Sequence, residues 1–67
     1  MDDICTRVGF SIRKQREGMG ISQEKLAELS ELHRTYIGQV ERGEKNLTLR
    51  SLERIAKALG RNTKDLL

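Results

Sequence analysis

The chain lacks several features that would assign it to common protein classes. It has no proline, no tryptophan and a single cysteine, Cys5, among 67 residues. One cysteine excludes an internal disulfide and fits a reducing compartment such as the cytoplasm. No segment approaches the roughly 18 apolar residues of a membrane span, and none near the start resembles a secretory signal. We therefore expect a cytoplasmic protein without a membrane partner.

Catalytic and metal-binding patterns are also missing. Cys5 has no cysteine or histidine at metal-ligand spacing, so we expect a half-buried helix residue and no metal site. His33 is the only histidine, with no cysteine near it, and suits a helix cap or a phosphate neighbour better than a general base. No glycine-rich phosphate loop follows a strand. The sequence predicts neither an enzyme nor a cofactor.

The composition favours one small globular unit. Hydrophobic residues make up 36% and charged residues 34%, which suits one small core and is too apolar for a disordered chain. We therefore treat residues 1–67 as a single domain. The net charge is +3, with 13 Lys and Arg against 10 Asp and Glu. That excess by itself raises the odds of nucleic-acid binding only slightly.

The apolar spacing is helical throughout, and no strand alternation appears. The first helix is expected over residues 3–19, with Ile4, Val8 and Ile12 in its apolar stripe and Asp2 or Asp3 as its cap. Gly9 inside this helix costs about 1 kcal/mol relative to alanine.

Two short helices are expected next, over residues 22–30 and 34–42. Ser22 is a strong N-cap candidate for the first of them, and Gly43 ends the second. A fourth helix follows the cap residue Thr48 and ends at Gly60. Its apolar stripe comprises Leu49, Leu52, Ile55, Ala56 and Leu59.

A fifth short helix is expected over residues 63–67, with Asn62 and Asp65 in capping-box positions. The predicted fold class is all-α, a compact five-helix bundle that contains a helix-turn-helix.

The helix expected over residues 34–42 has an unusual outer face. Ile37 and Val40 face inward, whereas Thr35, Gly38, Gln39 and Arg42 share the opposite face, which carries no acid. Arg34 emerges at the N-terminus of this helix, the end that meets the bases in a helix-turn-helix. Arginine can grip guanine with two hydrogen bonds, glutamine can do so for adenine, and threonine can pack on the thymine methyl. Arg34, Thr35 and Gln39 are the candidate base-reading residues.

Other polar residues are candidates for the DNA backbone. Gln23 opens the helix expected over residues 22–30, where a side chain and backbone N–H groups can meet a phosphate. A solvated first-turn residue is the alternative. The remaining candidates are Tyr36, Arg42, Lys45, Asn46 and Arg50. Tyr36 could equally be an edge-of-core ring, and Glu44 would repel phosphate. Gly38 fits either a close approach to DNA or chance.

Arg16 and Glu41 form a pair of another kind. Packing of the first helix against the third could bring them together as a partly buried ion pair with a structural role. A protein-interaction module, with the same helix face docked on a partner protein, remains the alternative to DNA binding.

Four segments together resemble the Cro/repressor-type helix-turn-helix family, also called the xenobiotic-response-element family. These are IRKQR (12–16), GISQEKLAE (20–28), HRTYIGQVERG (33–43) and NLTLRSLERIAKALG (46–60). The stretch HRTYI…ERG…NLTLRSL looks most like the small controller proteins of restriction–modification systems.

The resemblance implies a five-helix domain that binds a two-fold DNA operator as a homodimer. It assigns Gln23 to phosphate and Arg34, Thr35 and Gln39 to base reading, and it places Leu66 and Leu67 in the dimer contact. Half-sites would lie about 34 Å apart, one helical turn. A phage-type repressor or an antitoxin-like autoregulator fits the same pattern, and an activator would also contact RNA polymerase. Glu31 departs from the family, because glycine often holds that turn position.

Overall fold

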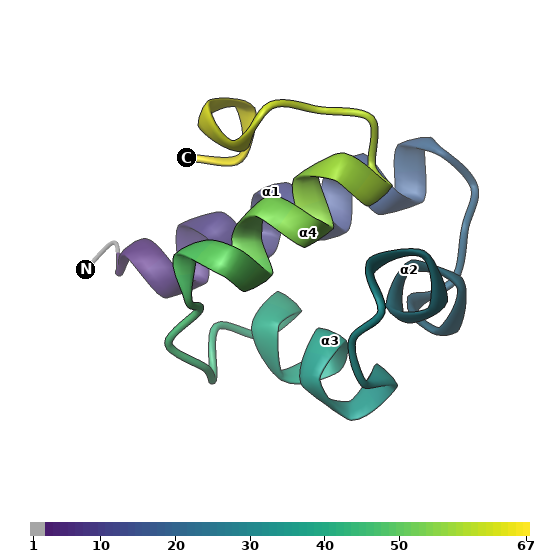
Figure 1. The fold of residues 1–67 in the computed structure, drawn as a ribbon. Coiled ribbons are helices and arrows are strands. Elements are labelled where there is room, and N and C mark those ends of the chain that lie inside the picture. The colour runs from purple at the N-terminus through teal and green to yellow at the C-terminus, as the bar shows by residue number, and fades with distance from the viewer. Residues whose placement is uncertain (1–2) are drawn as a thin grey trace.

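The structure, a computed structural model, describes residues 3–67. Helix α1 spans Ile4–Gly18, α2 Gln23–Ser30, α3 Arg34–Glu41 and α4 Leu49–Ala58, and a 3-10 turn, η1, spans Thr63–Leu66. In Figure 1, α4 lies in front of α1, with α2 and α3 below them and η1 above. Within the described residues the fold is all-helical, as the sequence predicts.

Local side-chain chemistry sets the helix boundaries. Ser22 Oγ accepts from the Lys25 backbone N–H at 3.0 Å at the start of α2, and Thr48 Oγ1 accepts from Ser51 N–H at 3.0 Å at the start of α4. These hydroxyls satisfy donors that a helix start leaves without an internal partner. Asp3 occupies the N-cap position of α1, but its side chain makes no capping bond. The alternative cap, Asp2, lies outside the described residues.

The turn between α2 and α3 is left-handed at a residue that is not glycine. Glu31 ends α2 with φ 58° and ψ 38°, a conformation that costs an ordinary residue roughly 1–2 kcal/mol. The backbone N–H of Leu32 nevertheless reaches the Ala27 carbonyl at 3.0 Å. Glutamate therefore occupies the turn position that was expected to prefer glycine, and the hydrogen bond that closes the turn is still formed.

The core is one cluster to which every helix and η1 contribute. Ile12, Leu26, Ile37, Ile55 and Leu66 are its largest fully buried side chains. Helix α2 packs against both α3 and α4, and α1 packs against α3. The helix pair α2–α3 is thus fixed from two sides, and its outer surface stays uncovered.

Two expectations about the elements are corrected. The fifth element is not an α-helix but a four-residue 3-10 turn, because its backbone bonds join residues three apart, Asp65 N–H to Asn62 O at 2.9 Å and Leu67 N–H to Lys64 O at 3.3 Å. The apolar stripes are also shorter than expected. Ile4 and Leu49, the first members of the α1 and α4 stripes, are 54% and 81% exposed.

No helix within residues 3–67 is long and apolar enough to cross a membrane.

Candidate nucleic-acid interface

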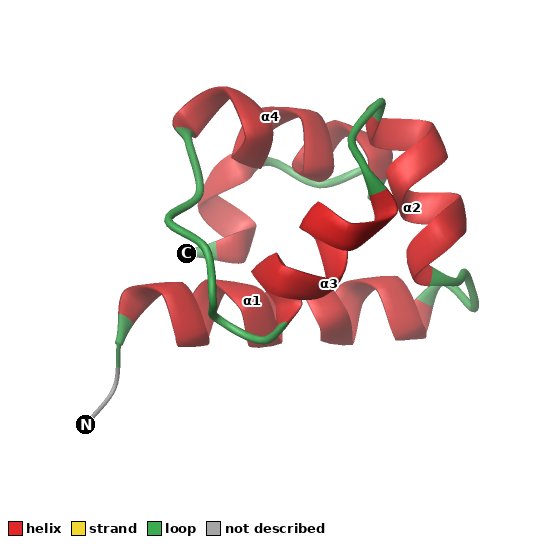
Figure 2. Ribbon diagram, turned by 90° about the horizontal axis from the view of Figure 1, so that it is seen from below, coloured by secondary structure: helices red, strands yellow, loops and turns green. Residues whose placement is uncertain are grey.

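Helix α3 presents one face to the core and the other to the surface. Ile37 and Val40 are buried, whereas Arg34 and Thr35 are exposed and Gln39 is half-buried. The three candidate base-reading residues therefore come from one uncovered strip of α3. Figure 2 shows the α3 ribbon in front of α1 and α4 in the view from below, and Gly38, between Thr35 and Gln39 on this strip, is buried.

A buried ion pair holds α3 to α1. Arg16 Nε donates to Glu41 Oε2 at 2.6 Å, and Arg16 Nη2 donates to Glu41 Oε1 at 3.0 Å. The side chains are 12% and 2% exposed. Arg16 Nη1 also donates to the Ile21 carbonyl at 2.9 Å, and the hydrogen bond to Glu41 raises the pKa of Arg16 above its ordinary value. The predicted pair is present, and it fixes α3 and the turn before α2 to the same guanidinium.

Gln23 belongs to this network. Its Nε2 donates to Glu41 Oε1 at 3.0 Å, so one amide hydrogen is already engaged inside the protein. The backbone N–H groups at the start of α2 and the second amide hydrogen remain for a phosphate. The alternative of a solvated first-turn residue does not hold, because the side chain is half-buried against α3.

Two glycines lie inside helices, and their surroundings differ in whether a larger side chain would fit. A Cβ at Gly9 would lie 2.2 Å from the Val40 carbonyl oxygen, so only glycine lets α1 approach the end of α3. The sequence shows only the helix-propensity cost of this residue. A Cβ at Gly38 would meet movable side-chain atoms instead, Arg42 Nη1 at 3.2 Å and Gln23 Oε1 at 3.5 Å.

Acidic residues reach the α3 face from its two ends, which the spacing within α3 does not reveal. Arg42 Nε and Nη2 donate to Glu44 at 3.0 and 3.2 Å, and Arg34 Nη1 lies 3.8 Å from Glu24 Oε2. The hydrogen bonds between Arg42 and Glu44 raise the pKa of the guanidinium and lower that of the carboxyl group. The face expected to carry no acid is therefore flanked by two.

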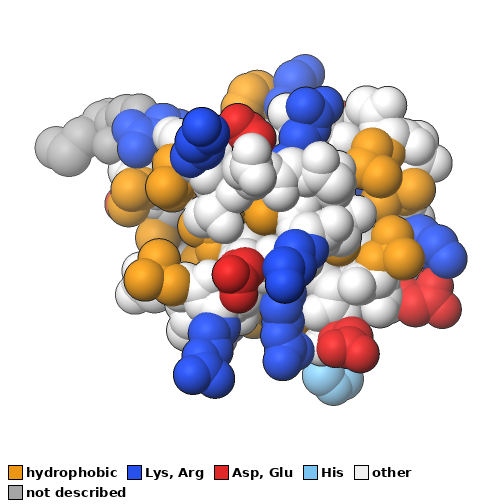
Figure 3. Space-filling view, turned by 45° about the horizontal axis from the view of Figure 1, so that its top comes forward, with side chains coloured by type: hydrophobic (Ala, Val, Ile, Leu, Met, Phe, Trp, Pro, Cys, Tyr) orange, Lys and Arg blue, Asp and Glu red, His pale blue; other side chains and the backbone are white. Residues whose placement is uncertain are grey.

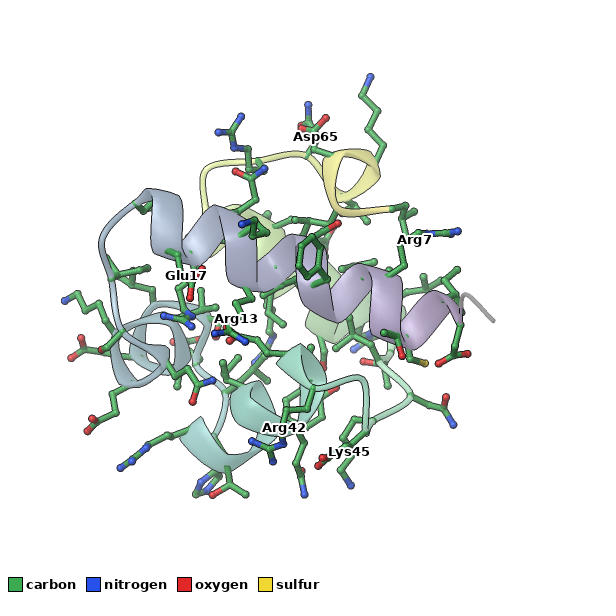
Figure 4. All side chains as sticks on the ribbon, turned by 180° about the vertical axis from the view of Figure 1, so that it is seen from behind. Arg7, Arg13, Glu17, Arg42, Lys45 and Asp65 are labelled. Atoms are coloured by element: carbon green, nitrogen blue, oxygen red, sulfur yellow. The ribbon has the colours of Figure 1, made fainter. Side chains whose placement is uncertain are left out.

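The segment after α3 carries the remaining backbone candidates. Lys45, Asn46 and Arg50 are all exposed. Arg42 and Lys45 project from α3 and the segment that follows it in Figure 4. Cys5 Sγ donates to Asn46 Oδ1 at 3.3 Å, which ties this segment to α1. Tyr36 is half-buried and packs against the core, so its ring occupies the edge-of-core position.

The two residues expected in the dimer contact differ in exposure. Leu66 is fully buried within the protomer, whereas Leu67 is 55% exposed. Leu66 has no surface to offer a second copy, because η1 turns it into the core. This corrects the expectation for Leu66.

His33 occupies the N-cap position of α3 without a side-chain capping bond. No group of three or more His, Cys, Asp or Glu residues in the described part of the chain could hold a metal ion. The candidate site is a polar surface built on two short helices.

Comparison with known proteins gives consistent matches. A helix-turn-helix family model matches residues 12–66. The chain is 54% identical over 67 residues to the control protein C.BamHI of Bacillus amyloliquefaciens, covering 98% of this chain and 83% of the relative.

Two solved structures of controller proteins are also similar. The restriction–modification controller protein C.AhdI from Aeromonas hydrophila superposes with a TM-score of 0.92 at 40% identity, covering 94% of this chain and 96% of that one. The controller protein C.Esp1396I, solved as a tetramer with its natural 35-base-pair operator, superposes with a TM-score of 0.86 at 44% identity over 92% and 82% of the chains. The matched proteins are regulators and not enzymes. The chain therefore belongs to the helix-turn-helix family, and within it to the controller proteins of restriction–modification systems.

Proposed function

We propose that this protein is a transcriptional regulator that binds a specific operator in double-stranded DNA through the major groove. The observation that carries the proposal is the uncovered strip of α3, whose first two residues, Arg34 and Thr35, are exposed while its inner face is locked into the core. An α-helix fits the major groove, and the N-terminal residues of a recognition helix contact the base edges. The operator complex of C.Esp1396I supports the same role for this chain.

Each side chain of the strip has a base-recognition role. Arg34 donates to guanine O6 and N7, Gln39 pairs with adenine, and the Thr35 methyl packs on a thymine methyl. Arg34 must exchange its contact with Glu24 for the base. That exchange is easy, because the two side chains are each 69% exposed and lie 3.8 Å apart.

Residues around the strip hold the sugar–phosphate backbone. These contacts fix the register of the protein on the duplex without reading its sequence. The first turn of α2 offers Gln23, the flank of α3 offers the Tyr36 hydroxyl, and the end of α3 and the segment after it offer Arg42, Lys45, Asn46 and Arg50.

A homodimer would place two α3 helices on a two-fold operator. Three exposed apolar side chains, Ile4, Leu49 and Leu67, border a hollow of about 250 Å³ at one end of the protomer. Figure 3 shows hydrophobic side chains at both sides of the molecule, one group lying toward the N-terminal end. We assign the dimer contact to this end, and the tetramer that C.Esp1396I forms on its operator supports self-assembly of this chain.

The biological role follows from the family. The protein would act in the cytoplasm, where its single thiol stays reduced, and would control a restriction–modification operon. As an activator it would also contact RNA polymerase. A phage-type repressor or an antitoxin-like autoregulator would use the same surface, and the genes beside the recovered operator separate these roles.

Selection of tight-binding duplexes from a random pool tests the proposal. We expect a recovered site with two-fold symmetry and half-sites about 34 Å apart. Its affinity should fall roughly 10³-fold or more between 50 and 200 mM salt if six or more phosphates are contacted. Recovery of no consensus site would contradict operator recognition. A protein partner bound through the α3 face with little salt dependence would support the interaction-module alternative instead.

A further inference from the structure

Helix α4 carries a row of cations along its outer side. Arg50, Arg54, Lys57 and Arg61 are all exposed and follow one another at intervals of four, three and four residues. Arg50, Arg54 and Lys57 therefore stand above one another on α4, and Arg61 follows three residues after the helix ends at Ala58. The buried side of α4, formed by Leu52, Ile55 and Ala56, faces the opposite way. We call these four cations the α4 row.

Within residues 3–67 the α4 row makes no ion pair, and neither do Lys14, Lys45 and Lys64, whereas several other cations do. Arg13, Lys25, Arg34 and Arg42 each have a glutamate within 4 Å. Among residues 3–67 no ion pair is formed by any member of the row, nor by Glu53, the one acid in α4. Neighbouring like charges at these spacings destabilise a helix by about 0.2–0.5 kcal/mol per pair.

The α4 row and the α3 strip lie on different sides of the molecule. In Figure 1, α4 lies above α3, and the view from below in Figure 2 puts α3 in front and α4 at the edge. Figure 3 views the molecule over α4 and η1, where Lys and Arg side chains are spread across the surface. A duplex bound along α3 therefore leaves most of the row uncovered, and Arg50, in the first turn of α4, is the one member also proposed to contact the operator backbone.

We propose that the α4 row binds the phosphate backbone of a second segment of duplex DNA without sequence preference. On α4 the row runs from Arg50 to Lys57, seven positions apart or about 10 Å at 1.5 Å per residue, and a duplex presents one phosphate charge per about 1.7 Å of its axis. Several phosphates therefore face the row at once. Counterion release from such contacts supplies sequence-independent binding.

The composition of the row favours nucleic acid over an acidic protein surface. Protein interfaces have an apolar core enriched in aromatic side chains, and the row contains none. A polyanionic backbone needs only positive charge within reach. The proposed consequence is that the protein can hold a second duplex before it leaves the first, so that it passes directly between DNA segments.

Competitor-dependent dissociation tests this proposal. The wild-type protein is loaded on a labelled operator duplex and challenged with rising concentrations of an unlabelled duplex that lacks the site. We expect the dissociation rate to rise with competitor in the range of roughly 1–100 µM, where non-specific contacts form. The double variant Arg54→Gln with Lys57→Gln should show a rate that competitor no longer changes.

Two matched variants separate the row from net charge. Arg13→Gln with Lys14→Gln removes the same charge from exposed positions of α1, and should keep the acceleration. A variant that exchanges the two residue types but keeps both positive charges, Arg54→Lys with Lys57→Arg, should also keep the acceleration by competitor. In equilibrium binding to a non-operator duplex, loss of two phosphate contacts should reduce the slope of log affinity against log salt by about 2.

The dissociation experiments have outcomes that would contradict the proposal or the function on which it rests. A wild-type rate independent of competitor, or a double variant that behaves like wild type, would overturn the role of the α4 row. Acceleration by polyglutamate and not by duplex DNA would replace it with an acidic protein partner. The inference uses the proposed function only for the first duplex. Failure to bind any operator would therefore contradict that function, while the salt dependence on a non-operator duplex would still test the row.

Discussion

Two arginine–glutamate pairs meet at the C-terminal end of α3, and their environments are opposite. Arg16 and Glu41 lie beneath α3, with side chains 12% and 2% exposed. Arg42 and Glu44 lie just beyond it, 58% and 54% exposed. Both pairs are joined by two hydrogen bonds of 3.2 Å or less. The difference between them is therefore one of environment and not of bond geometry.

The environment decides what each pair can do. The buried carboxylate of Glu41 has no water to replace a lost partner, so the pair must stay formed and holds α1, α2 and α3 in one arrangement. The exposed pair is screened by solvent and exchanges readily. Arg42 can therefore leave Glu44 for a phosphate while the scaffold beneath α3 stays fixed.

The largest expected effect comes from breaking the buried pair. Arg16→Ala removes the cation from the buried carboxylate of Glu41, which keeps only its hydrogen bond from Gln23, and loss of one partner of a buried pair typically costs about 3–5 kcal/mol. Urea denaturation should show a much lower midpoint than wild type. Arg42→Ala is the matched control, and its midpoint should stay near wild type. Equal midpoints for the two variants would show that the buried and exposed pairs do not differ as inferred.

Gly9 tests the helix contact that brings the buried pair together. Gly9→Ala places a Cβ 2.2 Å from the Val40 carbonyl, so α1 must move away from α3 at a cost of typically 1–3 kcal/mol. Gly38→Ala is the control, because its Cβ meets only movable side-chain ends and alanine is favoured in a helix by about 1 kcal/mol. Thermal denaturation should rank Gly9→Ala well below Gly38→Ala, and the reverse order would contradict this packing.

DNA binding distinguishes the two exposed arginines at the ends of α3, Arg34 at its first position and Arg42 at its C-cap. Arg34→Ala should lose about 1–3 kcal/mol of operator affinity and relax preference at one base pair. Arg42→Ala should weaken binding on all sequences alike and reduce the salt slope by about 1. Titration against a set of single-base operator variants distinguishes these patterns. A uniform loss for Arg34→Ala would make it a phosphate contact.

The smallest expected effect is a change in the titration of Glu44. Its hydrogen bonds from Arg42 hold the pKa of the carboxyl group below the ordinary value. The pair therefore contributes above the ordinary pKa, and its contribution is lost as pH falls through the lowered pKa. Carboxyl carbon NMR of Arg42→Gln should show the Glu44 pKa returned toward its ordinary value. An unchanged pKa would mean that the exposed pair is not formed in solution.

The helix pair and its outer face were predictable because they depend on neighbours in sequence. Ser22 and Thr48 cap α2 and α4 as their residue types predict. The three- and four-residue spacing within α3 placed Ile37 and Val40 inward. The same spacing could not show that Glu24 and Glu44 reach Arg34 and Arg42, because those acids lie outside α3.

Errors arose where burial depends on segments distant in sequence. Ile4 and Leu49 have core spacing, yet they lie at helix starts that no other described element covers. Leu66 and Leu67 are identical neighbours, and the single 3-10 turn sends the first into the core and leaves the second exposed. Residue type does not distinguish two leucines, so only their position against the other helices does.

The sequence by itself determined the all-helical class, the positions of α2 and α3 and the polar strip of α3, since helical period and capping act over a few residues. Only the tertiary structure decided why Gly9 is needed, how Gln23 joins Arg16 and Glu41, and which apolar residues remain at the surface. These features depend on the close approach of separate helices. In a close-packed interior the presence of a single methyl group matters, and a pattern of polar and apolar residues carries no information at that scale.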